Sequence, residues 1–150
     1  MAVGPFITHD TNFATLLSTD NWVTDDHYAV LAVSGSTPNP STWTEKSHIV
    51  GIKTPGGDYN HINLTGESVG VSSTKVKFDC DKITFTAAGS ITARYLYILK
   101  GTVAATASTD KIIGSIDLDG VGDISSVSAE FSFDPSATNG LFEIARSVAA

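Results

Sequence analysis

The sequence is short of cysteine, of charge and of long apolar runs. Its single cysteine, Cys80, excludes an intrachain disulfide and therefore a disulfide-stapled scaffold. Charged residues make up 17% of the chain, below the ~25% that is usual in soluble domains. No apolar run approaches the ~18 residues that a membrane-spanning helix needs, so we expect no membrane partner. The first ten residues do not resemble a signal peptide, and we expect synthesis in a cytoplasm.

Basic residues are also scarce. The sequence has nine lysines and arginines and sixteen aspartates and glutamates, which gives a net charge of −7. A protein that binds nucleic acid presents a basic face to the phosphates, so we expect no nucleic-acid partner. A net charge this far from zero favours solubility.

What the chain does have is typical of a β protein. Its 150 residues suggest one domain, large enough to bury roughly 70% of the unfolded surface without staples. Thr and Val suit a pleated, half-buried surface, while Ser, Gly and Asn suit turns.

Alternation of period two predicts eight or nine short strands, the number and spacing of an antiparallel β-sandwich. The strand order, jelly roll or other, stays open. The expected strands span residues 28–33, 48–53, 59–64, 75–78, 83–85, 91–99, 111–118, 126–133 and 141–145.

Residues 91–99 form the strongest of these predicted strands. Both faces are largely apolar, so we place the strand centrally, with both sides covered. One face would hold Ile91, Ala93, Tyr95, Tyr97 and Leu99. The same alternation groups Ile112, Gly114, Ile116 and Leu118 on one face of the strand at 111–118.

The N-terminus predicts an extended arm. Residues 1–13 are assigned to this arm and residues 14–150 to the β-sandwich domain, with at most one short helix, from Asp10 or Thr11 to Leu17. Phe6, Ile7 and Phe13 are apolar for an arm, so we expect them to dock on a partner or on another copy. Trp43 lies in the Pro-rich loop 34–44 and should pack as a lid.

Residues Gly66–Gly70 read GESVG and fit the G-x-S-x-G pattern of a hydrolase nucleophile elbow. An elbow needs a strand before the serine and a helix after it. Here VSSTKVKFD follows Ser68, which is rich in β-branched residues and has no helical period. We therefore interpret Ser68 as a loop residue, and a catalytic serine as the minor alternative.

Other candidate sites are also interpreted structurally. Asp117–Asp123 begins like a calcium loop, but Val121 and Ser128 stand where ligands are required, so it predicts an acidic turn. The four histidines form no ligand motif, and Asp25-Asp26-His27 suggests a solvated turn. Carboxylates beside Cys80 disfavour its thiolate. Arg94 is expected to pair with a carboxylate across the sheet rather than to bind a partner. We expect no catalytic residues, no metal and no cofactor.

One part of the sequence contains five short motifs in a fixed order. They are Phe78-Asp79-Cys80-Asp81, Ile83-Thr84-Phe85-Thr86, Thr92-Ala93-Arg94-Tyr95, Ile113-Gly114-Ser115-Ile116-Asp117 and Asn139-Gly140-Leu141-Phe142. These motifs resemble a recurring pattern in small structural proteins of tailed bacteriophage virions. Upstream, Asp26 to Val33, Glu45, Gly56-Gly57 and Asn63 to Gly66 lie in matching order, so the resemblance spans residues 14 to 145. One departure is Cys80, where the family usually has a small residue.

The resemblance implies a non-enzymatic β-sandwich that works as a capsid decoration (cement) protein. Such a protein would bind the major capsid protein on the outside of the virion as a homotrimer and stabilise the shell. Its N-terminal arm, with Phe6, Ile7 and Phe13, would lie across neighbouring subunits. Two alternatives are a tail, neck or fibre-associated virion part, and a carbohydrate-binding module that stacks a sugar on Trp43, Tyr59 or Tyr97.

Overall fold

The computed structural model describes residues 6–8, 21–52, 59–71, 75–86, 90–126, 130–138 and 140–145. Within these residues the chain forms twelve strands and two short 3-10 helices, η1 (Lys46–His48) and η2 (Val103–Ala105). The all-β prediction is therefore confirmed. The strands are β1 (Phe6–Thr8), β2 (His27–Ala32), β3 (Ile62–Asn63), β4 (Ser68–Val71), β5 (Lys75–Asp79), β6 (Ile83–Thr86), β7 (Thr92–Ala93), β8 (Tyr95–Lys100), β9 (Ile112–Asp117), β10 (Ile124–Ser125), β11 (Glu130–Phe133) and β12 (Phe142–Ala145).

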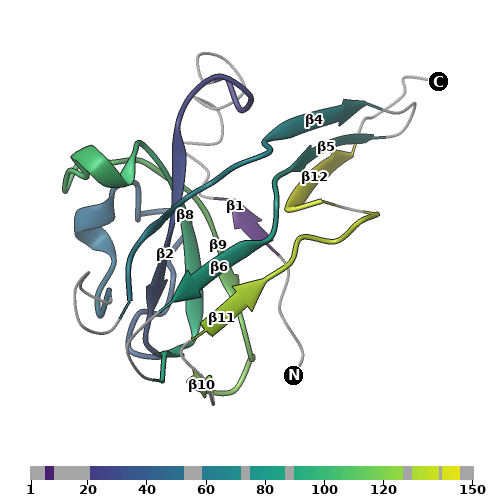
Figure 1. The fold of residues 1–150 in the computed structure, drawn as a ribbon. Helices are drawn as coiled ribbons and strands as arrows, with labels where there is room; N and C mark the ends of the chain where they lie inside the picture. The colour runs from purple at the N-terminus through teal and green to yellow at the C-terminus, as the bar shows by residue number, and fades with distance from the viewer. Residues whose placement is uncertain are drawn as a thin grey trace.

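The largest sheet has the order β1-β9-β8-β2-β3, and every neighbouring pair in it is antiparallel. Three smaller antiparallel sheets, β12-β5-β4, β11-β6 and β10-β7, complete the described fold. Strand β6 crosses over the large sheet, while β4, β5 and β12 extend away from it (Figure 1). The chain thus builds a central sheet and a second layer from strands that are distant in sequence.

The centre of the large sheet is buried on both faces. All six residues of β2 are buried, as are five of the six in β8 and in β9. These strands read HYAVLA, YLYILK and IIGSID, so apolar residues occupy consecutive positions rather than alternate ones. Such continuous runs are typical of strands that are covered on both sides. The predicted central position is confirmed for residues 95–100, because β8 lies between β2 and β9.

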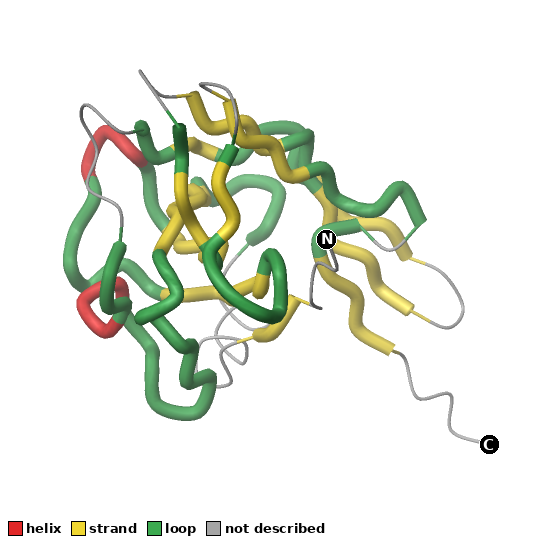
Figure 2. The backbone as a smooth tube through the Cα atoms, turned by 90° about the horizontal axis from the view of Figure 1, so that it is seen from below, coloured by secondary structure: helices red, strands yellow, loops and turns green. Residues whose placement is uncertain are grey.

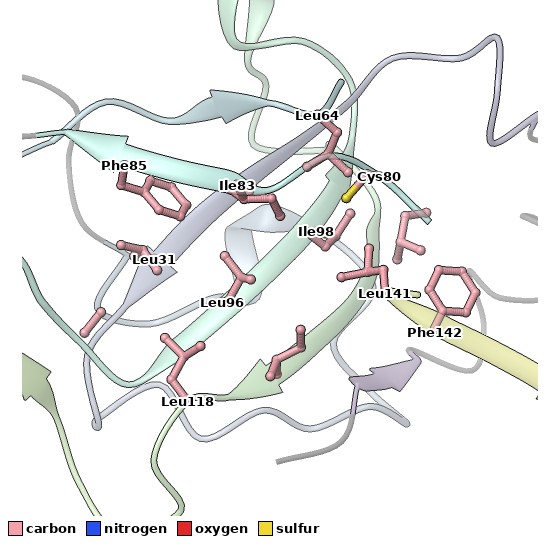
Figure 3. Packing of buried hydrophobic residues seen from close by; sticks show 14 of the residues in the cluster. Leu31, Leu64, Cys80, Ile83, Phe85, Leu96, Ile98, Leu118, Leu141 and Phe142 are labelled. Atoms are coloured by element: carbon pink, nitrogen blue, oxygen red, sulfur yellow. The ribbon is translucent and has the colours of Figure 1, made fainter. Parts of the chain in front are cut away.

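One face of the large sheet packs against the second β layer. Leu31, Leu96 and Ile98 meet Ile83 and Phe85 of β6 in a single apolar cluster (Figure 3). The opposite face carries Tyr28, Val30, Tyr95, Tyr97 and Leu99, and loops rather than strands cover it.

Backbone hydrogen bonds hold these covering loops to one another. Lys46 N–H donates to the Asp110 carbonyl and Ser47 N–H to the Ser108 carbonyl, each at 2.8 Å. Trp43 is half-buried and packs on this second cluster, as expected for a lid.

The predicted strand at 91–99 divides at Arg94, and the prediction of one continuous face is wrong. Ile91 and Ala93 lie in the cluster beneath the second layer, whereas Tyr95 and Tyr97 lie on the opposite face. The reason is a change of partner, because β7 pairs with β10 and β8 pairs with β2 and β9.

Strand β9 also departs from simple alternation. Its register with β8 shifts between Ile98 and Leu99, which face Gly114 and Ile112, so Ile113 is the extra residue of a bulge. Ile113 and Ile116 then share one cluster, while Ile112 lies in the other. The prediction that Ile112 shares a face with Ile116 is therefore wrong.

Two other predicted strands are shorter or missing among the described residues. In place of a strand at 48–53 the chain has η1 and a single bridge between Ala32 and Ile52. In place of 59–64 only β3 pairs as a strand. The prediction for 10–17 and the positions of Val127 and Ala129 lie outside the described residues.

Candidate interaction surface

Strands β12, β5 and β4 form an amphipathic sheet, which we call the ribbon. Its register places Val69 opposite Phe78, and Phe78 opposite Phe142. One pleat further along, Val71 lies opposite Val76, which lies opposite Ile144. Residues that are directly opposite in a sheet share a face. These six side chains therefore form one continuous apolar face.

The side chains on this apolar face become more exposed with distance from the body. Phe78 and Phe142 are buried in the main cluster, and Val76 and Ile144 are half-buried beside it. Val69 is 42% exposed and Val71 is 69% exposed. Both views show the ribbon leaving the body in this direction (Figures 1 and 2). The body therefore covers the inner half of the apolar face and leaves the outer half open.

The opposite face of the ribbon is charged but locally balanced. Lys75 Nζ lies 2.6 Å from Glu143 Oε2, and Lys77 Nζ lies 2.9 Å from Asp79 Oδ2. The ion pairs are partly exposed, so each contributes little to stability. Their effect is to leave the ribbon nearly neutral in a chain of net charge −7.

Stacked aromatic rings hold the base of the ribbon to the body. The Phe142 ring lies between those of Phe6 and Phe78, with centroids 4.8 and 4.6 Å away. Trp22 meets Phe142 and Phe78 edge-on at 5.5 and 6.0 Å. Such pairs each add ~0.5–1.5 kcal/mol to the stabilisation from area burial. This aromatic stack joins β1, the turn that precedes β2 and the ribbon.

Gly114 makes room for Phe6 over β9. Phe6–Thr8 pairs with Ile116–Gly114 in register, so part of the predicted arm is a strand of the large sheet. A Cβ on Gly114 would collide with the Phe6 ring and lie 2.7 Å from the Ile7 carbonyl oxygen. Glycine is therefore required where β1 and β9 approach most closely.

Of the four residues predicted to bind a partner, the three that the structure describes lie in three different environments. Phe6 belongs to the aromatic stack, and Trp43 packs on the second cluster of the large sheet. Ile7 is 40% exposed on β1, at the edge of the large sheet. Phe13 lies outside the described residues. Of the three described residues, Ile7 is the one left most exposed to a partner.

Two of the three rings that were predicted to stack on a sugar are not accessible to one. Tyr59 and Tyr97 are buried, and their hydroxyl groups donate to the carbonyl oxygens of Leu31 and Ser36 at 3.0 and 2.8 Å. A ring buried on both faces has no surface on which a sugar could stack.

Ser68 lies in a strand and not in a loop, so that prediction is wrong. It begins β4 and pairs with Asp79 of β5 in an antiparallel hairpin. A nucleophile elbow requires a helix directly after the serine, and here the described chain continues as a strand. Residues Gly66–Gly70 therefore do not build an elbow.

The carboxylates of the acidic turn after β9 accept hydrogen bonds from residues outside the turn. Arg94 donates to the two Asp117 carboxylate oxygens at 2.9 and 3.3 Å, which confirms the predicted pairing across the sheet. This hydrogen bond lowers the pKa of Asp117 and raises that of Arg94. Asp123 accepts hydrogen bonds from the Ser34 N–H and hydroxyl. Among the described residues, no group of three or more His, Cys, Asp or Glu is placed to hold a metal ion.

His27 is buried, so the prediction of a solvated turn is wrong for this residue. Its ring stacks on Trp22 at 4.5 Å, and its Nδ1 lies 2.6 Å from Glu67 Oε1. Sequence reasoning missed this pair because forty residues separate its members.

Cys80 should react very slowly in the folded protein. Burial first, and then Asp79, Glu67 and Asp81, raise the pKa of its thiol to about 12. Only the thiolate is nucleophilic, so we expect native labelling by Ellman's reagent at least ~100-fold slower than in denaturant. Unfolded protein, which should release one equivalent at once, is the control. A native rate within tenfold of the unfolded rate would contradict the buried position.

The signal for the ribbon was present in the sequence but incomplete. Alternation correctly grouped Val76 with Phe78, and it correctly placed a strand near 141–145. It missed β4 because SVGV is short and contains a glycine, so it looked like a connection. Without β4, the apolar face did not stand out.

No family model matches the chain, and no curated protein or solved structure is significantly similar to it. Among the described residues there is no helix long and apolar enough to cross a membrane.

Proposed function

We propose that this protein is a structural component of a tailed-phage virion, which decorates the outer capsid surface as a homotrimer and stabilises the shell. The observation that carries the proposal is the ribbon. It is a sheet held to the body by an aromatic stack, with an apolar face that continues past the body into solvent. Exposed apolar surface of this kind marks interaction sites.

The residues of the resemblance support the same proposal. Ile83–Thr86 is β6, Thr92–Tyr95 spans the break between β7 and β8, and Ile113–Asp117 lies in β9. They provide strands of both layers. The pattern shared with virion proteins is therefore the framework of the fold rather than an isolated motif.

Charge is consistent with a place outside the shell. The net charge of −7 would oppose contact with packaged DNA. The exposed Ile7 on β1 is the described part of the predicted arm that could contact the major capsid protein. An edge strand can recruit a partner by strand addition.

Copy number per particle tests the proposal. Quantitative mass spectrometry of purified virions that carry this protein should give hundreds of copies, in a fixed ratio to the major capsid protein. A handful or dozens of copies would instead favour the tail or neck. Absence from purified virions would contradict both positions.

A further inference from the structure

The outer half of the ribbon combines an open apolar face with an open strand edge. Val69 and Val71 are exposed, and no described strand pairs with the outer edge of β4. Proteins usually protect such an edge with lysine, proline or a bulge. The sequence of β4 is SVGV, which has none of these.

The near-neutral ribbon permits a second copy of this chain to bind there and disfavours a strongly charged partner. Two copies of net charge −7 repel each other across most of their surfaces. The ribbon is the exception, because β4 is uncharged and Lys75 and Lys77 are each paired with a carboxylate. A partner of strongly basic or acidic character would find no complementary charge there.

The shape of the ribbon also fits contact between copies. It extends away from the body, so ribbons from two molecules can approach while the rest of each molecule stays apart (Figures 1 and 2).

We propose that the ribbon is the self-association surface of this protein. The apolar faces of ribbons from neighbouring copies pack together through Val69, Val71, Val76 and Ile144, with β4 at the closest approach. The inference deepens the proposed function and rests on it only for the number of copies in the assembly.

Val71→Glu tests this surface in the full-length chain. Wild-type protein should be oligomeric by light scattering and sedimentation equilibrium over a series of concentrations. A charge at the centre of a small apolar contact should raise the dissociation constant at least about 30-fold. The matched control is Val50→Glu, which places the same charge on a valine that is 60% exposed outside the ribbon. It should change the dissociation constant by less than about threefold.

A second variant covers the case in which Val71→Glu does not fold. Val71→Thr keeps the β-branched shape and should give an intermediate loss of association, with an unchanged circular dichroism spectrum. A monomeric wild type, or equal association of the ribbon variants and the Val50→Glu control, would overturn the inference. A monomeric wild type whose binding to capsids is lost in Val71→Glu would overturn it too, and would assign the ribbon to the capsid protein.

These outcomes are separate from the test of the proposed function. Abundant copies on virions together with an unaffected Val71→Glu oligomer would overturn the self-association surface alone. Loss of association in Val71→Glu, with the protein absent from virions, would overturn the decoration role alone.

Discussion

Phe142→Ala is expected to lower the free energy of unfolding by about 3–5 kcal/mol, the usual cost of truncating a buried phenylalanine. The loss should lie towards the upper end of that range. Among the described residues, Phe142 contacts the rings of Phe6, Phe78 and Trp22, and these rings would border the cavity. In a chain of this length the melting temperature should fall by roughly 10 °C or more.

Urea denaturation of the wild type and the variant measures the effect directly. Phe131→Ala is the matched control, because Phe131 is only half-buried and, among the described residues, its ring contact is with Phe85 at 6.4 Å. It should cost less than half as much as Phe142→Ala. Phe142→Leu should recover part of the loss by refilling the cavity. A cost below about 1 kcal/mol for Phe142→Ala would contradict the central place of this ring.

The folded protein is expected to unfold in alkali. Tyr28, Tyr59 and Tyr97 have pKa values raised above the ordinary value, chiefly by burial. For Tyr28, the hydrogen bond from its hydroxyl to Asp110, at 2.6 Å, raises the pKa further. Each phenol therefore keeps its proton in the folded state at pH values where an unfolded tyrosine, with a pKa near 10, has lost it.

The direction of the effect follows from proton binding. Above about pH 10 the folded state binds more protons than the unfolded state, so stability falls as the pH rises and is fully retained below that pH. Each phenol contributes a slope of about 1.4 kcal/mol per pH unit, so three give about 4 kcal/mol per unit. A typical stability of ~5–15 kcal/mol would be lost within a few pH units.

Circular dichroism and absorbance at the tyrosinate band, followed together through an alkaline titration, measure this linkage. Tyrosine ionisation and loss of structure should coincide. Tyr97→Phe should lower neutral stability by ~1 kcal/mol through its lost hydrogen bonds. The same variant should reduce the alkaline slope by a third. Free titration of Tyr28, Tyr59 and Tyr97 near pH 10 with intact structure would contradict their burial.

Apolar runs and period-two alternation placed the strands that became β2, β5, β6 and β9, and the apolar character of both faces indicated the central position of β8. Alternation failed to predict which face a residue lies on where the pairing changes within a strand. The break at Arg94 and the bulge at Ile113 each reverse the side on which later residues lie. Alternation cannot detect such a reversal, because it depends on which strands lie alongside.

The candidate surface was only partly predictable for a related reason. Phe6 was predicted to dock on a partner or on another copy, but its ring stacks on Phe142, which is distant in the sequence of the same chain. The exposure of Val71 depends on how far the ribbon extends past the body, which no local pattern encodes. Residue type indicated which side chains prefer contact, whereas the three-dimensional pairing decided which contact each one makes.

The aromatic stack also sets the order in which a newly made chain can complete its fold. Its rings come from positions 6, 22, 78 and 142, so the first three are translated long before the last. The chain emerges from the ribosome at ~5–20 residues per second. Until residues 142–145 arrive, Phe78 and the β4–β5 hairpin lack the strand that completes their sheet. Contacts this distant in sequence form slowly. The ribbon therefore cannot be complete until β12 has been translated, well after β4 and β5.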